Sequence, residues 1–229
     1  FLKLKNKKEI WSVFQLSKSD FIVSTFSRFQ YYDFKNNLFR EVKTKNDGRI
    51  IESLQYRSKL GHVLILTWGE GLLLYDINSH QLNDLCNEAN CFSVSQNFEE
   101  IVVGGWNGYL YFLDNKKYSV RDSIQLKGST QYGGGSHLGN KEINNITFLN
   151  DRILLIDLKN DEYLILDIES KLSLKIFKLV NNNYLVKLPN TPYYMCSKGA
   201  SKMLHYVTPS LKVIGFDQLD PVYNRPDIV

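Results

Sequence analysis

The sequence predicts an all-β protein in which about five four-stranded blades form a β-propeller, either complete or part of a larger ring. Three observations lead to this prediction. Pairs of short apolar runs, separated by a tight polar break, recur five times along the 229 residues. An aspartate ends four of the second runs, at spacings of 43, 38 and 53 residues. No amphipathic helical stretch separates the repeats, and the 14 tyrosines and 13 phenylalanines favour strands.

The five pairs of runs supply the second and third strands of the predicted blades. They are almost continuously apolar, as in VLILTW and IVVGGW, which is typical of sheets that are covered on both faces. The pairs span residues 21–34, 63–77, 101–114, 153–168 and 193–207. The recurring aspartates are Asp33, Asp76, Asp114 and Asp167. We expect each of them to accept hydrogen bonds from the backbone of the turn that follows.

Each pair is flanked by two further candidate strands. The upstream segments are 10–14, 51–56, 91–95, 143–148 and 184–188, and the downstream segments are 38–44, 81–85, 121–127, 171–179 and 211–216. The propeller then spans 1–218, with 219–229 as a linker or tail, and its blades are 9–46, 47–87, 88–127, 128–179 and 180–218. A sandwich or barrel of many short strands is the main alternative, but it does not require a period near 40 residues.

The run IVVGGWNGYLYFLD resembles the core of a WD repeat, in which small residues, a glycine turn and alternating apolar residues precede a Trp-Asp pair. Gly104, Gly105, Gly108 and Asp114 occupy the corresponding positions. The sequence departs from the pattern because the Trp of Trp-Asp is replaced by Tyr or Leu, and no Gly-His dipeptide precedes a unit. The resemblance covers about residues 9–218 and implies a WD-repeat-like propeller. The opening FLKLKN belongs either to a preceding blade or to the strand that closes the ring.

The C-terminal YNRPDIV, residues 223–229, resembles the stretch that links a propeller to a caspase-like protease domain in bacterial WD-repeat proteins. This resemblance implies that a protease domain follows in the full-length chain. Its catalytic cysteine and histidine would then lie beyond Val229.

No motif in the chain predicts catalysis, a metal or a cofactor. The four histidines and three cysteines lack the spacing of a metal site, and GGG at 133–135 lacks the Lys-Ser/Thr of a phosphate loop. The net charge of +4 gives no strong case for nucleic acid, and no apolar run approaches the roughly 18 residues of a membrane span. Three cysteines without a disulfide framework suit the reducing cytoplasm.

Candidate contact residues cluster in the turns between the second and third strands. Trp68 and Trp106 each precede a terminal aspartate by eight residues, and Arg28 and Lys159 occupy comparable turns. A glycine-rich insertion between Lys127 and Ile143 carries Tyr132 and His137. We expect these residues to form one loop face that binds a protein or peptide, because Trp, Tyr and Arg dominate binding hot spots. Alternatively, the two tryptophans cap the hydrophobic interior of their blades.

These observations favour a non-catalytic protein-interaction, sensor or regulatory propeller that restrains a fused or associated protease. Two alternatives remain open. One is a scaffold subunit of a multiprotein complex. The other is an enzyme with its site in the propeller channel, where the first strands offer only Ser12, Ser53, Ser93 and Asn145.

Overall fold

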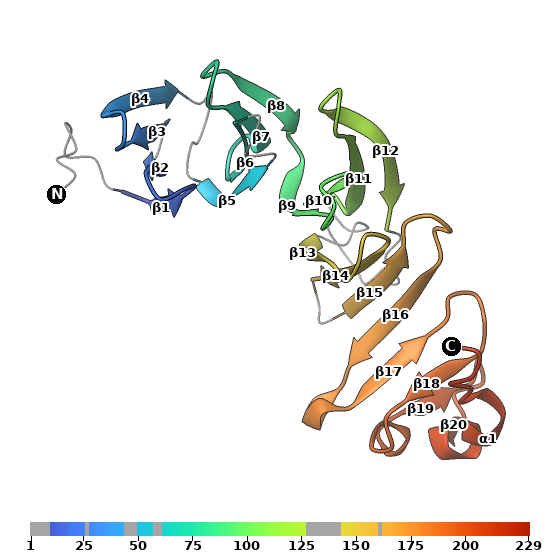
Figure 1. Cartoon of the computed structure of the whole chain (residues 1–229). Helices are drawn as coiled ribbons and strands as arrows, with labels where there is room; N and C mark the ends of the chain where they lie inside the picture. Colours follow the sequence, from blue (N-terminus) through green and yellow to red (C-terminus); the bar gives the residue numbers. More distant parts are fainter. Residues whose placement is uncertain (1–9, 26–27, 44–49, 57–60, 127–142, 160–161) are drawn as a thin grey trace. The chain divides into compact units, whose positions relative to one another are not determined.

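A computed structural model of the chain describes residues 10–25, 28–43, 50–56, 61–126, 143–159 and 162–229. In these ranges the protein is all-β, with several antiparallel sheets of two to six strands (Figure 1). This confirms the predicted class, and most predicted strands lie within two residues of an observed one. The chain divides into two compact units, Phe1–Glu142 and Ile143–Val229.

The first unit contains three four-stranded sheets whose strands follow one another in chain order. The first sheet is formed by β1 (Ser12–Gln15), β2 (Asp20–Thr25), β3 (Arg28–Asp33) and β4 (Leu38–Lys43). The second is formed by β5 (Ile50–Tyr56), β6 (His62–Thr67), β7 (Gly71–Asp76) and β8 (Leu82–Cys86). The third is formed by β9 (Ala89–Val94), β10 (Ile101–Gly105), β11 (Tyr109–Asp114) and β12 (Ser119–Gln125).

The middle strands of the second sheet are buried on both faces. Successive side chains of a strand point to opposite faces, and in β6 they enter two different cores. Val63 and Ile65 pack into a first cluster with residues of β2 and β3, whereas Leu64 and Leu66 pack into a second cluster with residues of β9 and β10. All four are at most 1% exposed. The second sheet is therefore sandwiched between the first and the third, as its continuous apolar runs predict.

The other face of the first sheet carries exposed apolar residues. Phe21, Tyr32 and Phe39 share this face, because the cross-strand register places them side by side. The Phe34 ring contacts those of Phe21 and Tyr32, and the Tyr32 ring also contacts that of Phe39. Phe34 and Phe39 are 51% and 46% exposed. Within the described residues, this face of the first sheet is therefore aromatic, like the face that is buried against the second sheet, but it is partly exposed to solvent.

The second unit contains one six-stranded sheet and one two-stranded sheet. The larger sheet is formed in chain order by β13 (Ile143–Phe148), β14 (Ile153–Leu158), β15 (Glu162–Asp167), β16 (Ser173–Lys178), β17 (Tyr184–Lys187) and β18 (Tyr194–Cys196). The smaller is the hairpin of β19 (His205–Val207) and β20 (Val213–Gly215).

The predicted fifth blade, residues 180–218, is not a separate four-stranded sheet. Its first two strands, β17 and β18, extend the six-stranded sheet instead. Asn181 and Asn182 both adopt positive φ in the turn after β16, and the Leu179 amide donates to the Asn183 carbonyl at 2.8 Å. Consecutive residues with positive φ make a tight hairpin turn, so β17 folds back directly onto β16.

The last part of the chain is irregular. A 3₁₀ helix, η3 (Ala200–Lys202), covers the end of the predicted polar break and the first residue of the second run. Only the end of that run forms a strand, β19, which pairs with β20. The tail 219–229 contains the four-residue helix α1 (Asp220–Tyr223). After this helix, the Arg225 amide donates to the Tyr194 carbonyl at 2.8 Å, so the tail runs beside β18.

Two glycines of the second sheet provide a matched test of its close packing. Gly61 and Gly71 have φ of +72° and +71°, so alanine at either should cost about 1–2 kcal/mol for its left-handed backbone. A Cβ at Gly71 would also lie 2.2 Å from the Cys86 carbonyl oxygen, whereas at Gly61 it would meet only the side chain of Asn78. We therefore expect Gly71→Ala to cost roughly 2–5 kcal/mol, since displaced packing adds about 1–3 kcal/mol.

Urea denaturation of both variants measures this difference. Equal losses for Gly61→Ala and Gly71→Ala would contradict the close approach of the β6–β7 turn to the chain that follows β8.

Candidate functional site

Trp68 projects from the tight turn between β6 and β7. Its side chain is 65% exposed, although the strands on either side of it are buried. The hydroxyl of Thr67 fixes the turn, because its Oγ1 accepts a hydrogen bond from the Glu70 amide at 3.1 Å and donates to the Gly71 carbonyl at 3.3 Å. The exposed indole therefore stands on an ordered turn.

Trp106 occupies the corresponding turn between β10 and β11 and is 59% exposed. Asn107 organises this turn, because its Oδ1 accepts from the Tyr109 amide at 3.2 Å and its Nδ2 donates to the Tyr111 hydroxyl at 2.7 Å. A Cβ at Gly105 would lie 2.3 Å from the Asn107 oxygen, so glycine makes room for this amide. Both tryptophans thus project outward, which argues against the alternative that they cap the interior of a sheet.

The two tryptophan turns lie at the same end of the sheets. Both contact the short connection between β8 and β9. Gly71, which begins β7 directly after the first turn, lies against the backbone of Cys86 and Asn87. The Trp106 amide, in the second turn, donates to the Glu88 carbonyl at 3.2 Å. We call this end, defined by Trp68, Trp106 and the 86–88 connection, the tryptophan end.

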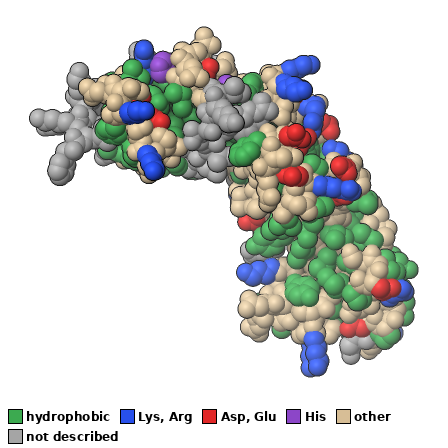
Figure 2. Space-filling view, viewed as in Figure 1, with side chains coloured by type: hydrophobic (Ala, Val, Ile, Leu, Met, Phe, Trp, Pro, Cys, Tyr) green, Lys and Arg blue, Asp and Glu red, His purple; other side chains and the backbone are tan. Residues whose placement is uncertain are grey.

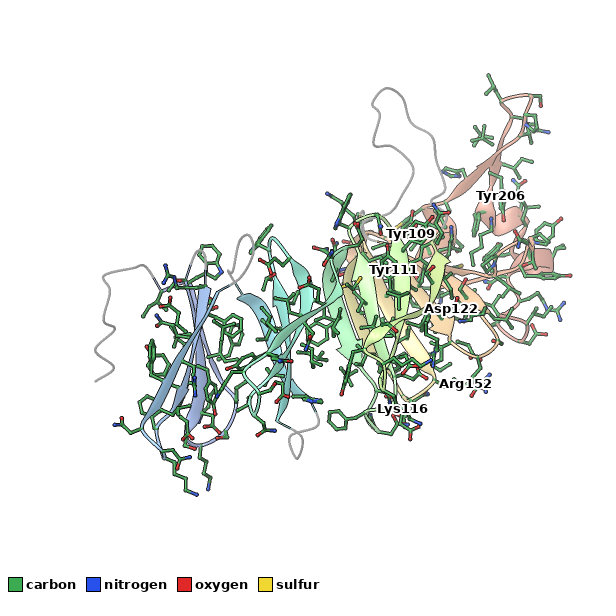
Figure 3. All side chains as sticks on the ribbon, turned by 90° about the horizontal axis from the view of Figure 1, so that it is seen from above. Tyr109, Tyr111, Lys116, Asp122, Arg152 and Tyr206 are labelled. Atoms are coloured by element: carbon green, nitrogen blue, oxygen red, sulfur yellow. The ribbon has the colours of Figure 1, made fainter. Side chains whose placement is uncertain are left out.

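Tyr109 and Tyr111 extend the tryptophan end along β11. Their rings stack with centroids 6.0 Å apart and an interplanar angle of 22°. Figure 3 shows both near one end of the third sheet and Lys116 at the other. Burial raises the pKa of Tyr111, so its phenol stays protonated at neutral pH. Sequence alone does not distinguish these tyrosines as contact residues, because alternate aromatics in a strand also suit a core. The signal that points to them is their closeness to the Trp106 turn.

The other predicted contact residues do not all join this group. Arg28 pairs with Glu41 across β3 and β4, and both side chains are about a quarter exposed. This ion pair engages the guanidinium within its own sheet. Lys159 is exposed at the end of β14, in the second unit. Tyr132 and His137 lie outside the described residues, as does the rest of the glycine-rich insertion.

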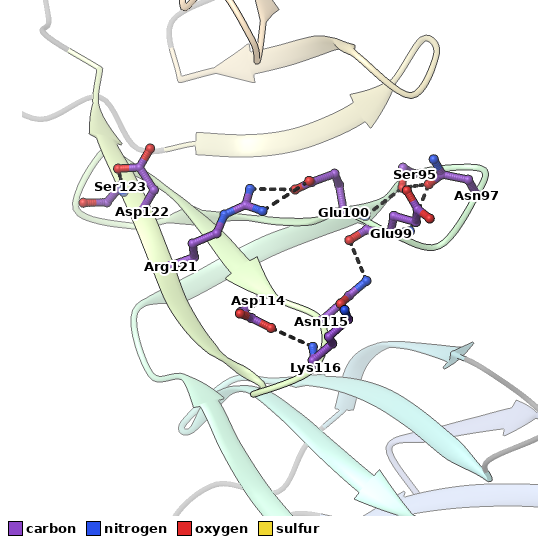
Figure 4. Close-up of polar contacts among 10 residues, drawn as sticks. All are labelled: Ser95, Asn97, Glu99, Glu100, Asp114, Asn115, Lys116, Arg121, Asp122 and Ser123. Carbon is purple, nitrogen blue, oxygen red and sulfur yellow. Dashed lines mark hydrogen bonds and ion pairs between the residues drawn. The ribbon is translucent and has the colours of Figure 1, made fainter.

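Each recurring aspartate ends the third strand of its sheet and accepts hydrogen bonds from the following turn, as predicted. Asp114 Oδ1 accepts from the Lys116 amide at 2.8 Å (Figure 4). The same oxygen accepts from the Lys117 amide at 2.9 Å. Backbone amides are bonded in the same way by the other three, namely Asp33, Asp76 and Asp167. The aspartates therefore have a structural role at the ends of β3, β7, β11 and β15.

These hydrogen bonds lower the pKa of every one of the four carboxyl groups. The Asn36 side chain lowers the pKa of Asp33, and the amides of Lys117 and Lys116 lower that of Asp114. Burial alone would raise the pKa of Asp76, but its bonds to the following turn outweigh this. The Arg152 guanidinium, which donates from Nε to Oδ1 at 2.8 Å, lowers the pKa of Asp167.

One cysteine and two histidines of the described residues are buried or hydrogen-bonded by other side chains. Burial raises the pKa of the Cys86 thiol to about 11, so it is not a thiolate at neutral pH. Two histidines are engaged by tyrosines, His80 with the Tyr75 hydroxyl at 2.9 Å and His62 with the Tyr118 hydroxyl at 2.8 Å. Within the described ranges, no three His, Cys, Asp or Glu side chains gather as metal ligands would.

Comparisons with known proteins assign the chain to no family. No family model matches the sequence, and no curated protein matches it. Of the helices that the structure describes, none has both the length and the apolar character to cross a membrane.

The aspartate turns predict how stability depends on pH. Because the folded-state pKa of Asp114 is lowered, its ionised form stabilises the fold above the unfolded pKa of about 3.9, and this contribution is lost as the pH falls through the folded value. We therefore expect Asp114→Ala to lower the melting temperature at pH 7. The variant should also lose less stability than the wild type between pH 5 and pH 2.

Thermal melts over this pH range test the prediction, with Glu99→Ala as the control, since the Glu99 carboxylate is exposed and bonds no described residue. If Asp114→Ala and Glu99→Ala behaved alike over this range, the turn hydrogen bonds would not be the source of the acid sensitivity.

Proposed function

We propose that this chain is a non-catalytic protein-interaction module whose tryptophan end binds a protein or peptide partner. One observation carries the proposal: Trp68 and Trp106 are both exposed on ordered turns, and both turns contact the same connection between β8 and β9. Large aromatic side chains held in this way are typical anchors of binding hot spots.

The ordered conformation of the two turns favours high affinity. Binding costs little conformational entropy there, because Thr67 and Asn107 already hold their turns by hydrogen bonds. Immobilising a free side chain or loop costs roughly 0.5–1.5 kcal/mol for each side chain, and preorganisation removes part of that cost. Tyr109 and Tyr111 would add rigid aromatic area beside Trp106.

The proposal includes a WD-repeat-like propeller as the architecture. It is supported by the four-stranded meanders, by the aspartate at the end of each third strand, and by the burial of the second sheet between two others. In a propeller, a neighbouring blade would cover the exposed aromatic face of the first sheet. That blade would either precede the first sheet or close the ring from its other end.

A narrower form of the proposal makes the module the regulatory part of a bacterial caspase-like protease. The support for it is the resemblance of residues 223–229 to a linker in such proteins. A cytoplasmic location belongs to this proposal, and the three free cysteines suit a reducing compartment.

Substitution of the tryptophans tests the proposed contact. We expect Trp68→Ala and Trp106→Ala each to weaken retention of the partner about 30-fold, because truncation of a hot-spot residue costs about 2 kcal/mol or more. The measurement is the dissociation constant for a partner recovered by affinity capture with the wild-type protein. Folding should be unaffected, since both side chains are exposed.

Trp11→Ala provides the matched control, because Trp11 is 53% exposed but precedes β1 rather than standing in a tryptophan turn. Wild-type binding by both turn variants, together with loss of binding by Trp11→Ala, would move the contact to the first sheet. The scaffold alternative would then replace the proposal.

A further inference from the structure

A concave pocket of about 510 Å³ opens in the second unit, between β17, β18, the β19–β20 hairpin and the C-terminal segment. Its wall is built of packed aromatic rings. Tyr206 stacks on Phe216 with centroids 4.8 Å apart at 13°, and Tyr194 lies 4.4 Å from the same ring. Tyr194 and Phe216 are only 2% and 6% exposed, so packing fixes them. Hydrophobic side chains also gather on the visible face of this part of the chain (Figure 2).

The size and lining of the pocket suit a small molecule with an apolar body. Sites for such ligands usually have volumes of about 300–1,000 Å³ and are lined mainly by apolar and aromatic side chains, with a few placed polar groups. Leu185 and Ile214 continue the apolar lining away from the rings. An apolar ligand would remove this surface from water, which is the main favourable term in such binding.

The polar groups of the lining favour a negatively charged head group. Lys187 is the one charged residue of the lining, and within the described chain it forms no ion pair. Tyr206 and Tyr223 also line the pocket, and their hydroxyls make no hydrogen bond to a described residue. The Tyr194 hydroxyl differs, because it donates to Asp220. The lining thus contains one ammonium group and two phenols, and the nearby Asp220 carboxylate, which is not part of the lining, accepts the hydrogen bond of Tyr194.

The phenol of Tyr206 is a hydrogen-bond donor at neutral pH. Burial raises its pKa above the ordinary value, and the neighbouring Tyr223 and Asp220 raise it further. A protonated phenol can donate to a carboxylate oxygen, and hydrogen bonds to a charged acceptor are stronger than those between neutral groups.

We propose that this pocket binds a small hydrophobic carboxylate. The apolar body lies against Phe216 and Tyr206, and the carboxylate pairs with Lys187. The inference is independent of the proposed function, because the tryptophan end belongs to the first unit and the pocket to the second.

Calorimetric titration of the full chain with 2-naphthoate tests the proposal, and 2-naphthalenemethanol serves as the neutral probe of the same shape. We expect saturable binding of 2-naphthoate at one site and at least tenfold weaker binding of the alcohol. Tenfold corresponds to about 1.4 kcal/mol.

Three variants locate the site. Lys187→Met keeps most of the apolar stem and should weaken 2-naphthoate at least tenfold while leaving the alcohol unchanged. Lys178→Met makes the same change at an exposed lysine of β16 outside the pocket and should bind like the wild type. Ile214→Trp fills the pocket from β20 and should abolish binding of both probes with an unchanged melting temperature.

Three results would overturn the proposal. The first is the absence of saturable binding by 2-naphthoate up to millimolar concentration. The second is equal affinity for the acid and the alcohol, or equal losses in Lys187→Met and Lys178→Met. The third is binding of a peptide with an apolar side chain, but not of 2-naphthoate, in a manner that Ile214→Trp abolishes, which would make the pocket a peptide groove.

Discussion

Burial of both faces of the second sheet is the constraint on which the first unit depends. A four-stranded antiparallel sheet with apolar residues on both faces cannot bury those faces by itself. Leu72, Leu73, Leu74 and Tyr75 are four successive residues of β7, and none is more than 3% exposed. Each such side chain contributes about 1.5–3 kcal/mol when it leaves water, and half of them would lose this contribution if either neighbouring sheet moved away.

This stacking also places the turns. β6–β7 and β10–β11 pack into one shared apolar cluster, and their connecting turns meet at the connection between β8 and β9. The aspartate turns lie at the other ends of the same strands. The two ends then differ in chemistry. One presents Trp68 and Trp106 to solvent, whereas the other uses Asp76 and Asp114 to satisfy its own backbone. The end that presents the two tryptophans to solvent is the end that we propose for binding.

Much of this follows from sequence. Continuous apolar runs predicted the doubly covered strands, and the recurring aspartates predicted the turns. The fifth unit differs, because two left-handed asparagines after β16 fold β17 back onto its neighbour, a choice of turn conformation that periodicity does not register. The ion pair of Arg28 with Glu41 is also not predictable, because it depends on a diagonal contact between neighbouring strands. The aromatic pocket joins short, irregular segments that show no hydrophobic periodicity in the sequence.

Two single substitutions in β6 test the double cover most directly. Leu64 and Ile65 are adjacent and fully buried, and they enter opposite clusters. Leu64→Ala and Ile65→Ala should each lower the free energy of unfolding by about 2–5 kcal/mol in urea denaturation. Leu172→Ala, at a residue that is 70% exposed, should change it by less than about 0.5 kcal/mol. A loss of that small size for either Leu64→Ala or Ile65→Ala would mean that one face of the sheet is open to water, and would contradict the account.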